Sequence, residues 1–365
     1  MMEHAEKYTR LHPTFKLNGS SCTLTSLREH AYAFIKKGEP YEEAAGEFII
    51  AWLDTKKYVT VHTSGSTGNP KPIKISKIHM VNSAKATAMH FKVFQKTTAL
   101  LCLPATYIAG KMMLVRAMTL GWHIDVAQPK ANPLDTVYKT YDFCAMTPFQ
   151  LDNSLSRLHL LAKLIVGGGA ISPSLSVRLQ GLKTKVYETY GMTETVTHIA
   201  ARRVNPKKVK EGIIPFKTLD KVTIETDHRD CLVIKAPKVS TDPVITNDLV
   251  QLLTYKKFIW LGRIDNVINS GGVKLFPEQI ETKIAPFIHV PYFVAGVPDQ
   301  RLGEQLTLFV EQDAPFLINE CLTDIRDFGP FEIPKHAVSL SSFERTATGK
   351  IQRPQTLKLY LNSLK

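Results

Sequence analysis

TSGSTGNPKPIKIS, from Thr63 to Ser76, is the stretch on which the fold assignment of this sequence depends. It sets hydroxyl side chains beside glycines and follows them with two lysines, Lys71 and Lys74. A loop that holds a polyphosphate needs open backbone N–H groups, hydroxyl donors and a cation, and this stretch supplies all three. Flexible linkers have a similar composition, so the surrounding sequence has to decide between the two.

Two other glycine-rich motifs do not fit this stretch. The P-loop pattern G-x-x-x-x-G-K-[ST] fails because Pro70 stands five residues after Gly65, where a glycine is required. The nucleophile elbow G-x-S-x-G fails because Ser64 stands two residues before Ser66, where that motif has glycine. The stretch therefore has to be judged together with motifs further along the chain.

The composition is that of a globular protein of about two domains, with 365 residues of which 44% are hydrophobic and 22% charged. No apolar run reaches the ~18 residues of a membrane-spanning helix, and the first residues lack the apolar core of a secretory signal. We expect a cytoplasmic protein without a membrane partner. A homo-oligomer is compatible with the sequence.

The formal net charge of +13 would suit a nucleic-acid binder, but the lysines are scattered and often adjoin acids. A solvated basic surface that attracts small anionic substrates is the favoured interpretation, and a non-enzymatic nucleic-acid binder is the remote alternative. The five cysteines stand far apart without a C-x-x-C pair, which argues against a disulfide framework or a zinc site. We expect them to be reduced and buried: Cys22, Cys102, Cys144, Cys231 and Cys321.

The hydrophobic pattern predicts an α/β fold. A helix is expected from Tyr41 to Leu53, followed by a strand over 57–62 that enters the quoted loop. Apolar runs of strand length then alternate with stretches of helical spacing, which indicates a sheet whose loops gather ligands at the strand ends. The expected strands are 98–104, 122–128, 163–171 and 185–191, and the expected helices are 112–121 and 174–182.

The pattern changes around Asp227, where short β-like runs begin. Strands are expected over 231–237, 249–255 and 257–263, as a β-rich close to a large domain. A second alternation then predicts a small α+β domain, with helices over 277–286 and 318–328 and strands over 292–298 and 306–312.

Four further motifs accompany the quoted loop: YGMTE from Tyr190, NDL from Asn247, WLGRIDNVINSGG from Trp260 and ATGKIQR from Ala347. In this order, the five stretches resemble the adenylate-forming superfamily of acyl-CoA synthetases, adenylation domains and luciferases. The stretch LPATYIAGKMMLVRAMTLGW, from Leu103, is similar to the o-succinylbenzoate-CoA ligases of menaquinone synthesis, especially their short forms. The segment before the phosphate loop is shorter than is usual in that superfamily.

The resemblance implies a domain organisation and a reaction. A large α/β AMP-binding domain with a β-rich closing portion would span 1–262, a hinge 263–265, and a small mobile α+β lid domain 266–365. The reaction would join a carboxylic acid to the α-phosphate of ATP with Mg²⁺, and then pass the acyl group to CoA. The alternative within the superfamily is an enzyme that adenylates another acid or loads a carrier protein.

The resemblance also assigns roles around the nucleotide. The loop residues implied to surround the β- and γ-phosphates are Thr63, Ser64, Gly65, Ser66, Thr67, Gly68 and Lys71. The residues implied to border adenine are Gly167, Gly168 and Gly169, with Tyr190 stacked on the ring, and Gly191 is implied to bind the nucleotide as well. The glycines could equally open a dinucleotide fold, although Ser172 stands where that motif has its last glycine; Glu188, nearly twenty positions on, keeps this alternative open.

Further residues are implied to act on phosphate, ribose and thiol. Thr193 would donate to the α-phosphate and Glu194 would hold Mg²⁺. Asp248 would accept the ribose hydroxyls, in a T-N-D triplet where the superfamily usually has T-G-D, with Asn247 in place of glycine. The remaining implied roles are ribose binding by Arg263, the hinge at Asp265, the tunnel for the CoA arm at Gly271 and Gly272, and a catalytic ammonium at Lys350.

The acid substrate is the least specified part. Many members carry a histidine in the stretch that matches LPATYIAG, and Tyr107 or its neighbours stand there in this chain. If the acid is o-succinylbenzoate, its second carboxylate needs a cation. The candidates are Lys111, Arg116 and His198, with His79 as another.

Overall fold

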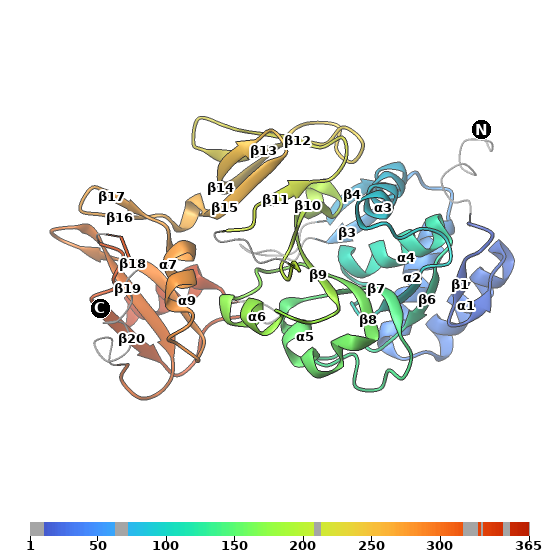
Figure 1. Ribbon diagram of the computed structural model, residues 1–365, viewed down its shortest axis with the longest axis horizontal. Helices are drawn as coiled ribbons and strands as arrows, with labels where there is room; N and C mark the ends of the chain where they lie inside the picture. Colours follow the sequence, from blue (N-terminus) through green and yellow to red (C-terminus); the bar gives the residue numbers. More distant parts are fainter. Residues whose placement is uncertain are drawn as a thin grey trace.

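The computed structural model describes residues 11–62, 72–207, 213–316, 328–329, 331–345 and 351–364. Thirteen strands of this part form one continuous sheet (Figure 1) in the order β12-β13-β14-β15-β11-β10-β9-β8-β7-β5-β6-β1-β2. One half is parallel, as the alternation of strands and helices predicts. Its strands are β1 (Lys16–Leu17), β5 (Thr98–Leu101), β6 (His123–Val126), β7 (Tyr141–Met146), β8 (Leu161–Val166) and β9 (Lys185–Gly191), with β2 (Ser20–Ser21) antiparallel at the edge.

The other half of the sheet is antiparallel, which confirms the predicted β-rich portion. It contains β10 (His198–Arg203), β11 (Phe216–Thr218), β12 (Thr223–Thr226), β13 (Cys231–Lys235), β14 (Val244–Thr254) and β15 (Lys257–Arg263). The strand predicted to begin at Leu249 starts five residues earlier, so Asp248 lies on β14 rather than in a turn.

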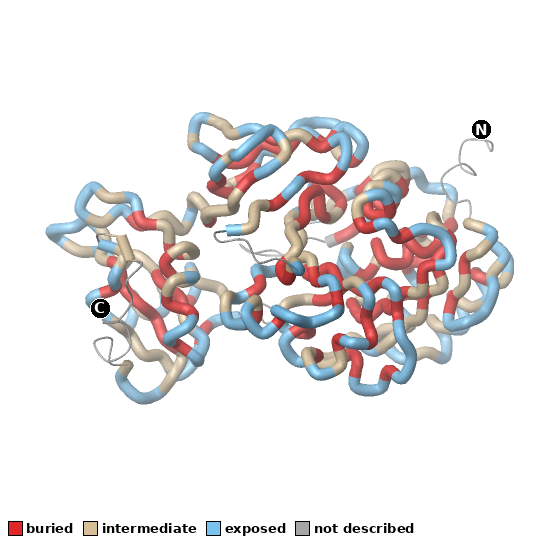
Figure 2. The backbone as a smooth tube through the Cα atoms, viewed as in Figure 1, coloured by how far each residue is buried: buried red, intermediate tan, exposed pale blue. Residues whose placement is uncertain are grey.

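Helices cover both faces of the parallel half. Alternate residues of one strand point to opposite faces, so Phe143 belongs to one hydrophobic core and Cys144 to the other. The first core packs against α1 (Leu24–Lys37), α2 (Pro40–Leu53), α3 (Lys77–Phe91) and α4 (Ile108–Leu120). The second packs against α5 (Pro148–Asn153), η1 (Leu155–Leu160) and α6 (Pro173–Arg178). Figure 2 shows the buried backbone concentrated between these layers.

A second sheet follows the short helix η3 (Ile264–Asn266). Its strands are β16 (Ile268–Ser270), β17 (Val273–Leu275), β18 (Tyr292–Asp299), β19 (Gly303–Glu311) and β20 (His336–Leu340), and its helices are α7 (Pro277–Ile284) and α9 (Arg353–Ser363). Ile280 and Ile284 of α7 are buried against this sheet, which gives the second sheet a hydrophobic core of its own. The helix predicted over 318–328 lies almost wholly outside the described residues.

Several sequence predictions need correction. The helix expected over 174–182 ends at Arg178, before Gly181, whose φ of +78° is left-handed. The helices α1, α3 and α9 were missed by the pattern. Among the described cysteines, Cys102, Cys144 and Cys231 are free and buried as expected, but Cys22 is half-buried, and Cys321 lies outside the described residues. In the described part of the chain, no helix is long and apolar enough to cross a bilayer.

Candidate active site

The predicted phosphate loop connects two strands of a separate ribbon. The strands β3 (Tyr58–His62) and β4 (Pro72–Ser76) pair with each other in antiparallel register, with His62 opposite Pro72. The predicted strand before the loop is therefore confirmed. The loop residues themselves lie outside the described part of the chain: Thr63, Ser64, Gly65, Ser66, Thr67, Gly68 and Lys71.

The adenine-site candidates lie at the carboxyl ends of two adjacent parallel strands. The glycines 167–169 follow β8, and Gly191 ends β9, which pairs with β8 in parallel register. A Cβ on Gly191 would lie 2.2 Å from the carbonyl oxygen of Thr197 and 2.5 Å from the Cα of His198. Only glycine allows β10 to approach β9 this closely, so Gly191 fixes where Thr197 and His198 lie.

A strained turn follows these glycines. Val196 is buried with φ +66° and ψ −64°, and the N–H of Thr197 donates to the carbonyl of Thr195 at 2.8 Å. This three-residue turn is rare, and left-handed backbone is costly for a β-branched residue. Such strain persists where the surroundings hold it in place, often at functional sites. Here it directs Thr197 and His198 into the interior behind Thr193, which is half-buried, and Glu194, which is exposed.

Two of the candidate cations meet in one buried network. Arg116 of α4 is only 2% exposed, and it donates from Nε to Thr87 Oγ1 and from Nη2 to Thr197 Oγ1, both at 3.2 Å. Thr87 Oγ1 also lies 3.2 Å from Nε2 of His198. The hydroxyl proton of Thr87 goes to the carbonyl of Ser83 at 2.9 Å, so Nε2 of His198 has to be the donor toward Thr87.

The electrostatics of this network are unusual. Burial lowers the pKa of Arg116 to about 9, so its guanidinium is still charged at neutral pH. Burial and then the charge of Arg116 lower the pKa of His198 well below its ordinary value, which leaves the imidazole neutral. The two hydrogen bonds to threonines use two of the five N–H groups of Arg116, and no carboxylate pairs with it among the described residues. A buried guanidinium that lacks a carboxylate partner among the described residues is a candidate for anion binding.

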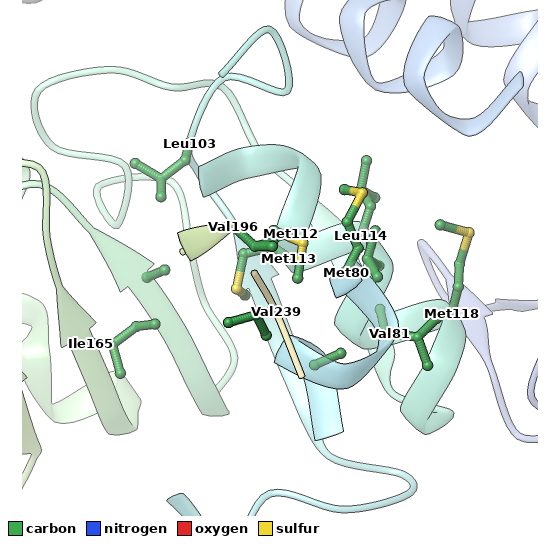
Figure 3. Close-up of a cluster of buried hydrophobic side chains, with 14 of the residues drawn as sticks. Met80, Val81, Leu103, Met112, Met113, Leu114, Met118, Ile165, Val196 and Val239 are labelled. Atoms are coloured by element: carbon green, nitrogen blue, oxygen red, sulfur yellow. The ribbon is translucent and has the colours of Figure 1, made fainter. Parts of the chain in front are cut away.

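The space around the network is partly apolar. A cavity of about 190 Å³ has Ser83 and His198 in its wall, together with apolar residues such as Met89, Leu219 and Val239. Figure 3 shows a buried hydrophobic cluster that includes Met80, Met112, Met113, Val196 and Val239, the last of which also lines this cavity. Methionine side chains adapt their shape readily, so this cluster can adjust to a neighbouring apolar group.

The other substrate candidates do not join the network. Lys111 donates from Nζ to the carbonyls of Ala105 at 2.5 Å and Thr106 at 2.8 Å, and it lies 5.7 Å from the ring centre of Phe48. Burial lowers the pKa of Lys111 to about 8. Its role in the structure is to hold the loop before α4, which makes it unsuitable as the cation for a second carboxylate. Tyr107 caps α4 and is 37% exposed, and His79 is half-buried on α3.

The ribose candidates form a second group, on β9, β14 and β15. Asp248 is 7% exposed and accepts hydrogen bonds from the hydroxyl of Tyr190 at 2.6 Å and from Nε1 of Trp260 at 3.2 Å. Nη1 of Arg263, the register partner of Asp248, lies 3.9 Å from the same carboxylate. Burial and the charge of Asp248 raise the pKa of Tyr190, which therefore stays a hydrogen-bond donor. Each oxygen of Asp248 keeps a lone pair for a further donor.

Tyr190 is the only member of this group that packs on other rings among the described residues. Its ring centre lies 5.2 Å from that of Phe258, edge to face, and 6.0 Å from that of Phe216. Its hydroxyl donates to Asp248, so the residue expected to stack on adenine contacts the residue expected to accept the ribose hydroxyls. The sequence motifs did not indicate this contact, because the two residues are 58 positions apart.

The acidic residue that kept a dinucleotide fold open has another role. Glu188 is 4% exposed, and its two oxygens accept from the backbone N–H of Ile171 at 3.1 Å and from Arg202 at 2.7 Å. It therefore orders the glycine segment and does not point at a ribose. With Glu188 in this role, the dinucleotide-binding alternative has no structural support.

The hinge and lid candidates lie beyond β15. Asp265 is in η3, where it accepts from Arg263 at 2.8 Å and from Asn247 at 3.3 Å. Gly271 and Gly272 form the turn of the β16–β17 hairpin, with φ values of +58° and +82°. Lys350 lies outside the described residues, and its flanks Arg345 and Ile351 face each other in an isolated antiparallel bridge.

Sequence reasoning missed four side chains of these groups. Ser83 and Thr87 lie on α3, whose mixed small and polar sequence carries no motif, and Thr197 follows YGMTE without being part of it. Arg229 was also missed; its Nη1 donates to Asn247 at 3.1 Å. The one available signal was the adjacency of Thr197 to the candidate His198.

Comparisons with known proteins indicate the family of this chain. Residues 28–222 match the family model described as AMP-binding enzyme. The 2-succinylbenzoate–CoA ligase of Staphylococcus epidermidis (strain ATCC 12228 / FDA PCI 1200) is 26% identical over 330 residues, covering 82% of this chain and 69% of that protein.

Two solved structures are also similar. An acyl-CoA synthetase (AMP-forming)/AMP-acid ligase II-like protein from Dyadobacter fermentans DSM 18053 is 36% identical, covers 91% of this chain and 98% of its own, and has a TM-score of 0.60. The o-succinylbenzoate CoA synthetase (MenE) from Bacillus subtilis, in complex with its acyl-adenylate intermediate, is 21% identical, with coverage of 81% and 68% and a TM-score of 0.71; at this identity it supports the fold alone. The family match covers more than half of the chain, and the chain therefore belongs to the AMP-binding enzyme family.

Proposed function

We propose that this chain is an ATP-dependent acid–CoA ligase that converts 2-succinylbenzoate to its CoA thioester, a step of menaquinone synthesis. The observation that carries the choice of acid is the charged Arg116, which is buried and has no carboxylate partner among the described residues. A substrate with two carboxylates can place one on this guanidinium while the other reacts. The similarity to 2-succinylbenzoate–CoA ligases supports the same acid.

The apolar surroundings suit the rest of this substrate. The buried cluster of Figure 3 contains several methionines, whose side chains can adapt their shape to a neighbouring aromatic ring. Thr87, Thr197 and the neutral His198 hold the guanidinium in place without neutralising it. Binding of an anion would therefore return the free energy that burial of the cation costs the free enzyme.

The nucleotide would lie across the carboxyl edge of β8 and β9. Asp248 and Arg263 would hold the ribose, Tyr190 would position the adenine side, and Thr193 would donate to the α-phosphate. Glu194 fits a Mg²⁺ ion, because its carboxylate is exposed in the short helix η2 (Thr193–Thr195), which follows β9. Magnesium is commonly held by one or two carboxylates together with phosphate and water, and it would neutralise phosphate charge there.

The reaction has two steps, each of which depends on alignment and charge neutralisation. A carboxylate oxygen of the acid attacks the α-phosphorus, the bond to pyrophosphate breaks, and an acyl-adenylate forms. The thiol of CoA then attacks the acyl carbon, loses its proton and expels AMP. Lys350 would stabilise the charge of the first step, and rotation about Asp265 would bring Gly271 and Gly272 to the CoA arm for the second.

The test is ATP–pyrophosphate exchange with a panel of acids. The panel contains 2-succinylbenzoate, two analogues that each lack one of its carboxylates, and a fatty acid. We expect rapid exchange with the diacid alone. Rapid exchange with an analogue that keeps only the reacting carboxylate would reject the role of Arg116. No exchange with 2-succinylbenzoate would reject this acid and leave the family assignment unchanged.

The acceptor and the location are part of the same proposal. We propose free CoA rather than a carrier protein as the acceptor, because the similar curated proteins are CoA ligases. Release of AMP with CoA, compared with release with candidate carrier proteins, tests this choice. Since ATP and CoA are both co-substrates, the cytoplasm is the proposed location.

A further inference from the structure

Asn247 occupies the middle of the T-N-D triplet, where the superfamily pattern has glycine. A glycine there has no side chain to interact with. Here the amide of Asn247 contacts two charged side chains from different parts of the chain. Nη1 of Arg229 donates to its Oδ1 at 3.1 Å, and its Nδ2 lies 3.3 Å from both carboxylate oxygens of Asp265.

The orientation of this amide is determined by its partners. A guanidinium has no acceptor, so the oxygen of Asn247 has to face Arg229. An ionised carboxylate has no donor, so the NH₂ group has to face Asp265. The two contacts are mutually consistent, and neither can be kept if the amide flips.

Arg229 is itself firmly held. It lies in the turn between β12 and β13, where Asp227 binds its side chain at 2.7 Å and the carbonyl of Thr246 accepts from it at 3.1 Å. Asn247 therefore connects the antiparallel half of the large sheet to Asp265. Asp265 in turn binds Arg263 at 2.8 Å, so the residue implied to act as hinge is held from both sides.

We propose that Asn247 is a positioning residue that holds the carboxylate of Asp265 and thereby restrains the hinge in the orientation seen here. This inference rests on the proposed two-step reaction and its hinge. In this orientation the β16–β17 hairpin extends from the outer part of the small domain, away from the large sheet (Figure 1). The glycines of its turn cannot line a tunnel on the large domain until the small domain rotates.

The strength of the contact suits a restraint that is broken in every catalytic cycle. Contacts of 3.3 Å are at the long end for hydrogen bonds, and Asp265 is exposed, so the interaction is weak. Loss of one such bond changes an equilibrium about three- to tenfold, or ~0.7–1.4 kcal/mol at 1.4 kcal/mol per tenfold. Release of the hinge should therefore increase the fraction of molecules that can rotate by a similar factor.

The experiment uses two variants of the full chain and one control. Asn247→Gly restores the superfamily pattern. Asn247→Asp keeps the size of the side chain and its contact with Arg229, but it sets two carboxylates against each other. The control is Asn153→Ala, which removes an exposed hydrogen bond of 2.8 Å from the side-chain amide to the carbonyl of Phe149, far from the hinge in sequence and on a different element.

Two measurements are made on each protein. Amide hydrogen exchange of the peptide that covers residues 262–268 needs no substrate, so it tests the restraint even if the proposed acid is wrong. We expect exchange to be about three- to tenfold faster in both Asn247 variants and unchanged in the control. The second measurement is the ratio of two single-turnover rates, thiolation of supplied acyl-adenylate over adenylation, which we expect to rise by a similar factor.

The outcomes are distinct. Unchanged exchange at 262–268 in both Asn247 variants would overturn the restraint. Faster exchange with an unchanged ratio would overturn the positioning role in the reaction, and an equal fall of both rates would indicate general damage and overturn it as well. If wild-type protein adenylates none of the acids in the panel, the proposed substrate fails, and the exchange measurement still decides whether Asn247 holds the hinge.

Discussion

Replacing Arg116 with methionine tests whether the buried guanidinium serves the substrate or the fold. Methionine has a similar length and is already common around this position, at Met112, Met113 and Met118. The change removes two hydrogen bonds of 3.2 Å, to Thr87 and Thr197. It also removes a charge that lies buried with no carboxylate partner among the described residues.

The two effects on stability have opposite signs. Each lost hydrogen bond costs about 1 kcal/mol, whereas burial of an uncompensated charge costs several kcal/mol, and buried ionic groups are often replaced by apolar ones without loss. We therefore expect Arg116→Met to leave the melting temperature unchanged or to raise it. Binding of the second carboxylate should suffer instead, because loss of one partner of a buried charge pair costs about 3–5 kcal/mol. This corresponds to a fall in kcat/KM of roughly a hundredfold to several thousandfold.

The assay compares ATP–pyrophosphate exchange for 2-succinylbenzoate and for the analogue that lacks the second carboxylate. The variant should lose most of its activity with the diacid and little of its low activity with the analogue. Arg116→Lys, which keeps the charge but not the planar fork, should fall between the two proteins. Equal losses with both acids, together with a clear fall in melting temperature, would refute the argument, because a structural arginine would behave in that way.

Four other changes test separate parts of the site. Lys350→Ala should slow adenylation by orders of magnitude and spare thiolation of supplied acyl-adenylate, as measured in separate single turnovers; equal loss in both steps would contradict it. Gly191→Ala should lower the free energy of unfolding in urea by about 1–3 kcal/mol, because its Cβ would lie 2.2 Å from the carbonyl oxygen of Thr197. The control Gly169→Ala should cost far less, because its Cβ would lie 3.6 Å from Pro148. Equal costs would refute the close approach of β10 to Gly191. Asp248→Asn should raise the KM for ATP at least tenfold with little change in KM for the acid, and an unchanged KM for ATP would remove Asp248 from the ribose site. Burial lowers the pKa of Lys111 to about 8, whereas the ordinary lysine value is ~10.4. Between these two pH values the folded chain binds fewer protons than the unfolded chain. The free energy of unfolding therefore rises with pH in this window. Lys111→Met should remove this rise, on the order of 1 kcal/mol because the group is partly solvated, in urea unfolding at pH 7.5 and 9.5; an identical pH dependence in both proteins would reject it.

The sequence predicted those parts of the fold that depend on local pattern. The strands Lys185–Gly191 and Lys257–Arg263 were predicted with the bounds that the structure has, because β-branched and aromatic residues predominate in each. The helix α3 was missed because its small and polar residues give a weak periodic signal, although most of its inner face is buried. Packing against α4 and β10, rather than local preference, holds it in place.

In the candidate site, too, the sequence indicated individual residues but not the contacts between them. The motifs indicated Asp248, Arg263 and Tyr190 separately, but not that Tyr190 donates to Asp248. Arg116, His198 and Lys111 were all predicted as the cation for a second substrate carboxylate, but Lys111 lies elsewhere on α4. Five residues separate Lys111 from Arg116, which turns them to different sides of the helix, and only the packing of α4 shows which side faces Thr197.

The ribbon of β3 and β4 does not belong to either larger sheet, so its two strands depend on contacts outside those sheets for stability. At its base the buried Lys77 donates from Nζ to the carboxylate and to the backbone carbonyl of Asp54. A two-stranded ribbon is pliable by itself. An isolated two-stranded ribbon is only marginally stable in water, so the order of β3 and β4 depends on this contact at their base.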